Sequence, residues 1–342
     1  MNILLTGASG FAGAHMLKYL VENFNYNIFC PVTYQHGGHP QRIKSLISEK
    51  NLNKTRVFYC DLATANLTDF DFINNIDLIL NFASESHVDR SISSPNLFIA
   101  NNSNVTINLL EFARSQNPKV RFVHISTDEV YGSIPKGESN IEWERIYSPS
   151  NPYSASKASQ ESLIISYYRT YNLPSVIINS TNIVGEAQNI EKFIPKSIRC
   201  ILENQTVYVD TDVNGQLGSR KYLDVNDVSS AVWLASTTLL DGEYKQYIDL
   251  PLKFHISGQN EVTNLEVINS LSSYLGVKPK IKIRPSPRNG YDLRYELTCD
   301  KLTKLGWKSS SQVLGRINEI ADWTIRNSEW LQYNHQSNFH NF

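Results

Sequence analysis

A glycine-rich segment at residues 7–13 constrains the fold more than any other part of the sequence. It follows a short apolar run at residues 3–5 and leads into a helical pattern at residues 12–23. In a strand–turn–helix of this kind, glycines allow a tight turn and let backbone N–H groups approach a phosphate. The spacing is GxxGxxG, and a plain turn is the alternative. We therefore predict a dinucleotide-binding loop. The predicted contacts are Gly7, Ser9, Gly10, Phe11 and Gly13.

Short β-rich runs alternate with longer helical patterns through the first half of the chain. This alternation predicts parallel strands joined by right-handed crossovers, and therefore an α/β fold with a Rossmann-type doubly wound parallel sheet. We expect strands at residues 3–5, 28–32, 57–60, 78–82, 120–126 and 175–179, and helices at residues 12–23, 97–115 and 153–171.

The alternation ends near residue 182, where Gly, Pro and Asn become frequent. We expect a smaller C-terminal substrate-binding lobe from there, with a helix at residues 222–239 that returns to the sheet. The predicted organisation is a dinucleotide-binding domain at residues 1–181 plus about 222–254, a substrate-binding lobe at residues 182–221 and 255–330, and a loose polar tail at residues 331–342.

Composition narrows the classes of partner. The 342 residues carry a net charge of −1, so the overall charge attracts neither nucleic acid nor an anionic membrane. The apolar runs are too short for a membrane helix, and the N-terminus does not resemble a signal peptide. The four cysteines lie far apart without a CxxC pair, which argues against a disulfide framework or a zinc site. We expect a cytoplasmic protein without a bound metal.

The position after the second strand usually carries an acid that binds the adenine ribose. Here Cys30 stands at that position, and no acid occurs between positions 22 and 49. The loop that follows carries His36, His39 and Arg42, which could bind a 2′-phosphate or be solvated. NAD and NADP therefore both stay open. After the third strand, Asp61 could accept a hydrogen bond from the adenine amino group or cap a helix.

Tyr153 and Lys157 are four residues apart at the start of a helical pattern that Pro152 opens. This spacing puts both side chains on one helix face. A nearby ammonium group and a nicotinamide cation both favour a phenolate, so we predict that the pKa of Tyr153 is lowered toward that of a useful base. An exposed pair without a catalytic role is the alternative.

Asp128 and Glu129 follow the strand predicted at residues 120–126. Ligands of open α/β sheets bind beyond the carboxyl ends of the strands. Neighbouring side chains on a regular strand point to opposite faces. Both carboxylates can therefore serve one substrate only if the strand has ended by Asp128. A solvated turn that caps a helix is the alternative.

Four segments together resemble the nucleotide-sugar 4,6-dehydratases of the dTDP-glucose type, which belong to the extended short-chain dehydrogenase/reductases. The resemblance covers about residues 1–310. A 4-epimerase would not normally carry the Asp128–Glu129 pair. The resemblance implies NAD as the cofactor and a nucleotide-diphosphate sugar as the substrate. The segments are residues 6–13, 81–92, 126–132 and 151–159.

The resemblance also implies a role for each matched residue. Tyr153 takes the proton of the sugar C4 hydroxyl while hydride leaves C4, Lys157 tunes Tyr153 and binds the nicotinamide ribose, and Thr127 hydrogen-bonds the C4 oxygen. Glu129 then removes the C5 proton, Asp128 protonates the departing C6 hydroxyl, and hydride returns to C6. The product is a 4-keto-6-deoxy sugar nucleotide. Further cofactor contacts are implied at Asp61, Leu62 and Ala83. Substrate contacts are implied at Ser84, Glu85, His87, Asn182, Glu191, Lys192, Arg220, Asn264, Arg288 and Tyr291.

Departures from the family pattern fall on ligand contacts. They include Cys30, the stretch 208–218 and Tyr291, which stands where a histidine is usual. UDP-glucose, UDP-N-acetylglucosamine and dTDP-glucose therefore stay open as substrates. The competing functions are a 4-epimerase or decarboxylase, a 5,6-dehydratase on the same scaffold, and a non-enzymatic cofactor-sensing protein. The family's dimer helices match residues 97–115 and 153–171, so we expect a homodimer.

Overall fold

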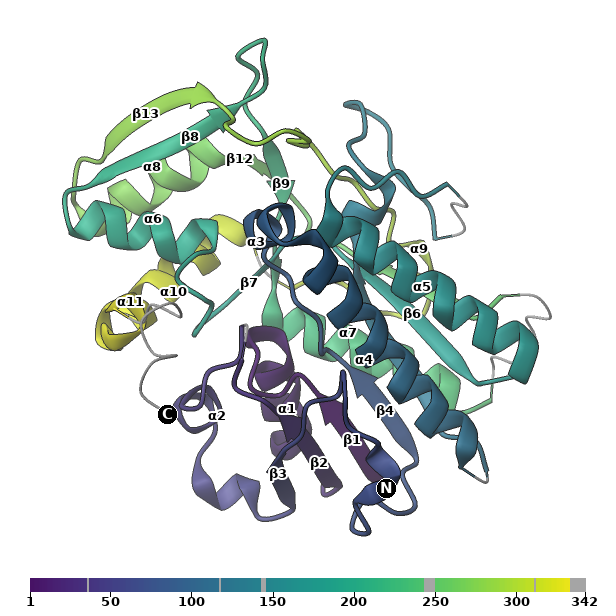
Figure 1. Ribbon diagram of the computed structural model, residues 1–342. Coiled ribbons are helices and arrows are strands. Elements are labelled where there is room, and N and C mark those ends of the chain that lie inside the picture. The colour runs from purple at the N-terminus through teal and green to yellow at the C-terminus, as the bar shows by residue number, and fades with distance from the viewer. Residues whose placement is uncertain (36, 117, 143–145, 243–249, 311, 333–342) are drawn as a thin grey trace.

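A parallel sheet lies at the centre of the molecule (Figure 1). The structure is a computed structural model that describes residues 1–342 except 36, 117, 143–145, 243–249, 311 and 333–342. The sheet has seven strands in the order β11-β6-β5-β4-β1-β2-β3. Every neighbouring pair is parallel, which confirms the doubly wound sheet. The strands are β1 (Asn2–Thr6), β2 (Asn27–Val32), β3 (Thr55–Tyr59), β4 (Leu78–Asn81), β5 (Arg121–Thr127), β6 (Ser175–Ser180) and β11 (Leu252–Ile256).

Helices cover both faces of this sheet because its strands are apolar on both sides. On one face, α1 (Phe11–Asn23) and α7 (Val225–Leu240) share a buried cluster with Ile3 and Leu5. On the other face, α4 (Pro95–Ser115) and α5 (Pro152–Tyr171) share a second cluster with Leu4. The alternation along β1 thus divides the apolar core into two layers.

A smaller lobe has an apolar cluster of its own, in which Ile198, Val267 and Ile317 are fully buried. Its strands pair outside the main sheet, β8 with β13 in parallel and β9 with β12 antiparallel. In Figure 1 these elements lie together above α1 and α2. They are α6 (Phe193–Leu202), β8 (Thr206–Thr211), β9 (Ser219–Lys221), β12 (Glu261–Thr263), α8 (Asn264–Leu275), β13 (Lys280–Pro285) and α10 (Val313–Arg326).

Short elements connect these layers. They are α2 (Arg42–Leu46), η1 (Glu49–Leu52), η2 (Leu67–Asp69), α3 (Val88–Ser93), η3 (Asp128–Tyr131), β7 (Ile183–Val184), β10 (Leu223–Asp224), α9 (Asp300–Lys304) and α11 (Glu329–Gln332).

Two predicted boundaries were wrong. The helix expected from residue 222 begins at Val225, because β10 pairs with β7 first and the Asp224 side chain then caps α7 by accepting from the backbone N–H of Asn226 at 2.7 Å. The tail expected to be loose from residue 331 still belongs to α11, in which Leu331 is buried. The rest of that tail, residues 333–342, lies outside the described residues.

Within the described ranges, no helix combines the length and the apolar character needed to cross a bilayer.

Candidate active site

The glycine loop closes tightly between β1 and α1. Gly7 has a φ of +70°, and a Cβ there would lie 2.7 Å from the carbonyl carbon of Phe82. A Cβ on Gly13 would lie 2.2 Å from the Gly7 oxygen, so α1 could not approach its strand as closely. Gly10 offers no side-chain cap to α1, and the first turn of the helix holds no acid. The N–H groups at this helix start are therefore suited to an anion such as a pyrophosphate.

The far end of the loop is braced by a buried cation. Arg42 is fully buried, and its guanidinium donates to the backbone oxygens of Ser9, Gly37 and Ala187 and to Oδ1 of Asn189. The suggestion that Arg42 binds a 2′-phosphate or is solvated was therefore wrong, because its donors hold the chain itself.

His39 and Cys30 are not placed to bind a 2′-phosphate either. His39 is buried against the ring of Trp330 at 4.3 Å, and its Nδ1 accepts from the N–H of Gln41. Cys30, on β2, lies in the apolar core, where burial raises the pKa of its thiol. His36 lies outside the described residues.

The predicted adenine end of the site lies after β3 and β4. Oδ1 of Asp61 accepts from the N–H of Ala63 at 3.0 Å, so this carboxylate stabilises a local turn while it also faces the cleft. Leu62 and Ala83 line the cleft beside it. The N–H of Ala83 donates to Thr6 Oγ1 at 3.1 Å, which ties the end of β4 to the end of β1.

One cleft of about 530 Å³ joins these segments to the smaller lobe. It is lined by all of the predicted cofactor and catalytic residues. Among the predicted substrate residues, His87 is the one that does not line it; the Nδ1 atom of His87 instead caps α3 by accepting from the N–H of Arg90. The substrate residues that line the cleft are Ser84, Glu85, Thr127, Asn182, Glu191, Lys192, Arg220, Asn264, Arg288 and Tyr291.

The adjacent acids both face the cleft because β5 ends at Thr127 and a 3₁₀ turn begins at Asp128, as the two-carboxylate hypothesis requires. Asp128 is 2% exposed. Its Oδ1 accepts from Thr127 Oγ1 at 3.0 Å, whereas its Oδ2 is buried with no hydrogen-bond partner among the described residues. Burial, with a smaller effect of Glu129, raises the pKa of Asp128 to about 8. Asp128 is thus a protonated acid near neutral pH.

Glu129 is placed differently. Burial raises its pKa too, but the positive charges of Arg220 and Lys192 oppose that rise. Nδ2 of Asn151 lies 3.5 Å from its Oε2. These neighbours favour the ionised form of Glu129 over that of Asp128, so the pair divides into an acid and a base.

The half-buried Tyr153 and the buried Lys157 face the same cleft from α5. Nζ of Lys157 donates to the oxygen of Ile125 at 2.7 Å and lies 3.3 Å from Nε2 of His124. Burial lowers the pKa of Lys157 to about 7, while the Glu161 carboxylate opposes that change.

The chain's own residues do not lower the pKa of Tyr153, so that prediction was wrong for the protein alone. Burial, followed by the Glu129 charge, raises it, and a hydrogen bond with Thr127 only partly opposes the rise. Of the two cations that were expected to favour the phenolate, a positively charged nicotinamide is the one that the chain itself does not supply.

The smaller lobe brings cations to the other end of the cleft. The guanidinium of Arg220 donates to the backbone oxygens of Ser219, Leu293 and Asp292 at 2.7 to 2.8 Å and stacks on Tyr295. Lys192 donates to the oxygen of Ser86. These contacts fix the two cations in place beside the cleft.

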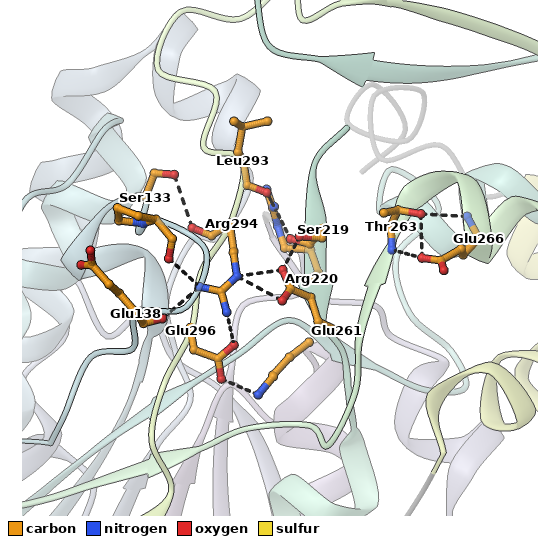
Figure 2. A network of polar contacts seen from close by, with 12 residues as sticks. Ser133, Glu138, Ser219, Arg220, Glu261, Thr263, Glu266, Leu293, Arg294 and Glu296 are labelled. Atoms are coloured by element: carbon orange, nitrogen blue, oxygen red, sulfur yellow. Dashed lines mark hydrogen bonds and ion pairs between the residues drawn. The ribbon is translucent and has the colours of Figure 1, made fainter. Parts of the chain in front are cut away.

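A second arginine, Arg294, holds the segment that carries the hydrogen-bond acceptors of Arg220 (Figure 2). Arg294 pairs with Glu261 at 2.9 Å and with Glu296 at 2.7 Å, and also donates to the backbone oxygen of Glu138. This cluster holds residues 292–296, which carry the carbonyl groups that accept from Arg220.

The remaining substrate candidates line the same end. Arg288 pairs with Asp89 at 3.2 Å and is exposed. Oδ1 of Asn182 is buried without a hydrogen-bond partner among the described residues. The Tyr291 hydroxyl donates to the oxygen of Asp210, and Asn264 accepts from the Tyr222 hydroxyl.

Sequence reasoning missed several cleft residues. Arg90 lines the cleft, and its Nε is buried without a partner among the described residues. Arg90 belongs to the resembling segment 81–92, so that motif was the available signal. Tyr208, Asp210 and Tyr295 also line the cleft. The first two fall in the stretch 208–218, which was noted only as a departure from the family pattern, and no motif marked Tyr295.

We predict that Asp128→Asn stabilises the protein increasingly as the pH rises from 5 to 8. The folded carboxyl holds its proton up to about pH 8, whereas the unfolded one loses it near 3.8, so the free energy of unfolding falls with pH in this window. Removing the group should recover roughly 1 kcal/mol per pH unit. Thermal melting at several pH values measures this gain. Parallel pH dependences for the two proteins would contradict the raised pKa.

Comparisons with known proteins agree with this geometry. The family model described as GDP-mannose 4,6 dehydratase matches residues 4–320. The probable dTDP-glucose 4,6-dehydratase of Sinorhizobium fredii is 34% identical over 97% of this chain and 95% of its own length. The dTDP-glucose 4,6-dehydratase of Haemophilus influenzae is 33% identical, with 96% and 99% covered.

Solved structures give the same result. That of dTDP-glucose 4,6-dehydratase from Streptomyces venezuelae, with NAD and TYD bound, has a TM-score of 0.83 at 30% identity and covers 96% of this chain and 98% of its own. A UDP-glucuronic acid 4-epimerase from Bacillus cereus, at 22% identity and a TM-score of 0.84, shares the fold. The chain belongs to the nucleotide-sugar 4,6-dehydratases of the extended short-chain dehydrogenase/reductase family.

Proposed function

We propose that this protein uses NAD to dehydrate a nucleotide-diphosphate hexose to its 4-keto-6-deoxy form. The observation that carries the proposal is the placement of Asp128 beside Glu129 in the cleft that Tyr153 also lines, with Asp128 buried so that its pKa is raised. An epimerase needs no acid at C6, so this pair favours dehydration over epimerisation.

The first step is oxidation at C4. Tyr153 takes the proton of the C4 hydroxyl, and the Thr127 hydroxyl, which lies beside Tyr153, holds the C4 oxygen. Lys157, anchored on the oxygen of Ile125, places its positive charge near that reaction. The glycine loop would hold NAD, whose nicotinamide would supply a hydride acceptor at C4 and a hydride donor at C6 within one cycle.

The second step is loss of water across C5–C6. The C4 ketone acidifies the C5 proton, which Glu129 removes. The C6 hydroxyl leaves as water with the proton of Asp128. When hydride reaches C6, Glu129 returns a proton to C5. Tyr153 then releases its proton and Asp128 regains one from solvent, so the net reaction is loss of one water without net oxidation.

Cations at the lobe end of the cleft suit a diphosphate. Arg220 and Lys192 are held in place by backbone oxygens, and Arg288 lies on the rim. Planar guanidinium groups match pairs of phosphate oxygens. We propose these three as the diphosphate contacts. Since relatives of this chain are dTDP-glucose 4,6-dehydratases, dTDP-glucose is the first substrate to test, followed by UDP-glucose and UDP-N-acetylglucosamine.

Mass spectrometry of the nucleotide hexoses after incubation with the enzyme tests the function. We expect one of them to lose 18 Da without added reductant, because the cofactor is regenerated in the cycle. A 4-epimer of unchanged mass would indicate an epimerase. Cofactor binding without any turnover would favour a sensing protein. Retention of unsaturation in the product would indicate a 5,6-dehydratase.

We predict that Glu129→Gln stops the reaction after oxidation. Tyr153 can still accept the C4 hydroxyl proton, but the amide cannot remove the proton from C5. Absorbance near 340 nm should therefore rise and persist in a single turnover, and the 18 Da loss should fall by about a hundredfold or more. Tyr153→Phe is the matched control and should give neither signal. A Glu129→Gln protein that fails to reduce the cofactor would remove this residue from the C5 step.

We also propose a homodimer formed through α4 and α5, and a cytoplasmic location. Leu97 and Ile99, at the start of α4, are 75% and 38% exposed, and Ile92 on the preceding α3 is 44% exposed. The absence of disulfides among the four cysteines supports a reducing compartment. Light scattering should give twice the chain mass of 38.9 kDa, and Leu97→Glu should shift the mass toward one chain. A wild-type protein of single-chain mass would contradict the dimer.

A further inference from the structure

A buried ion pair lies on α5 one turn beyond Lys157. Glu161 is fully buried, and its Oε2 accepts from Nζ of Lys253 at 2.8 Å and from the Tyr147 hydroxyl at 2.9 Å. Lys253, on β11, is 6% exposed and lies over the rings of Tyr131 and Tyr147. Neither charged residue lines the cleft. The pair is therefore a charged group beneath the catalytic face rather than a part of it.

The other carboxylate oxygen of Glu161 connects this pair to the end of β5. Oε1 accepts from Ser126 Oγ and, at 2.7 Å, from Nδ2 of Asn179. The same Asn179 nitrogen also donates to the backbone oxygen of Thr127 at 2.9 Å. Ser126 and Thr127 are the last two residues before the turn that carries Asp128 and Glu129. Two hydrogen-bonded routes thus lead from Glu161 to the point where the strand ends.

Glu161 also acts on Lys157 through space. Tyr153, Lys157 and Glu161 are spaced by four residues, so they share one face of α5. Burial lowers the pKa of Lys157, and the Glu161 charge is the group that opposes this change. The carboxylate itself stays ionised, because Lys253 and its other donors hold its pKa below the ordinary range despite burial.

We propose that the Glu161–Lys253 pair is a positioning device for the dehydration reaction: it fixes the end of β5 and places a carboxylate one helical turn from Lys157. This inference rests on the proposed function for its kinetic consequences. Lys253 supplies the counter-charge that lets Glu161 remain a carboxylate in the core. Glu161 then acts on Thr127 through the Asn179 side chain and on Lys157 through its negative charge.

Other titratable groups surround the two sites and bear on any pH effect. His124 on β5 lies beside Lys157, and burial keeps the pKa of this imidazole well below its usual range. His255 on β11 is likewise held neutral, with its Nε2 2.9 Å from the Tyr131 hydroxyl. Lys301 on α9 donates to the oxygen of Lys253. None of these groups supplies a negative charge near Lys157, so Glu161 is the residue to vary.

The test compares Glu161→Gln, Lys253→Met and the double variant with the wild-type enzyme. Each single change leaves one buried charge unpaired and should lower the melting temperature, whereas the double variant should recover most of that loss. Activity should not recover. In the double variant, kcat should fall about tenfold or more, with KM within about twofold of wild type, since the diphosphate contacts are intact. Lys253→Arg keeps the positive charge beside Glu161, so its kcat should be close to that of the wild-type enzyme and above that of Lys253→Met.

The pH profile separates positioning from general stability. Since Lys157 loses its proton more easily without Glu161, the alkaline limb of kcat should move down by about one pH unit in the double variant. Arg316→Met is the control away from the cleft, because it removes the cation of another ion-pair network, with Asp224 and Glu186. It should lower the melting temperature and leave the alkaline limb in place. Wild-type kcat and an unmoved limb in the double variant would overturn the inference.

A second measurement does not depend on turnover. Melting temperatures from pH 5 to 9, taken with and without Lys157→Met, report where the folded Lys157 loses its proton. A lowered lysine pKa makes the stability rise with pH above that point. The start of this rise should lie at lower pH in proteins that carry Glu161→Gln. If no sugar nucleotide reacts but the pH at which stability begins to rise is lower in these proteins, the proposed function fails and the effect of Glu161 on Lys157 stands. If that pH is unchanged, the inference is overturned.

Discussion

The chemistry of this protein depends on where one strand stops. Had β5 continued past Thr127, Asp128 and Glu129 would point to opposite faces of the sheet. The strand instead turns into η3, and both carboxyl groups line the cleft together with Tyr153. The backbone that makes this turn is fixed from below, by the amide of Asn179 on the oxygen of Thr127. A local change of backbone direction therefore makes two adjacent acids available to one hexose ring.

Burial then gives the two acids different tasks. It raises the pKa of both, and Arg220 opposes that rise at both. Lys192 and Asn151 further oppose it at Glu129, while one oxygen of Asp128 has no partner among the described residues. A proton donor and a proton acceptor thus stand side by side at one pH. Burial of the Asp128 carboxyl lowers the free energy of unfolding near neutral pH, and active sites commonly lower stability in this way.

Local patterns in the sequence were sufficient for six of the seven strands, the glycine loop and the Tyr153–Lys157 pair, because each depends on residues close together in the chain. The seventh strand, β11, was not predicted. Contacts between distant segments were not predictable in this way. Arg42 looked like a surface cation, yet it donates to oxygens of residues 9 and 187 and is fully buried. Lys253 carried no motif, yet it pairs with Glu161 across 92 positions. The raised pKa of Tyr153 likewise depends on burial and on Glu129, neither of which the helix spacing reveals.

The central claim is that a single active site oxidises C4, removes water and reduces C6 of the same sugar. A nucleotide hexose that carries deuterium at C4 tests this most directly when the product is examined by NMR. The account predicts that the deuterium appears at C6 of the 4-keto product. Loss of the C4 label to solvent, or a product still labelled at C4, would contradict it.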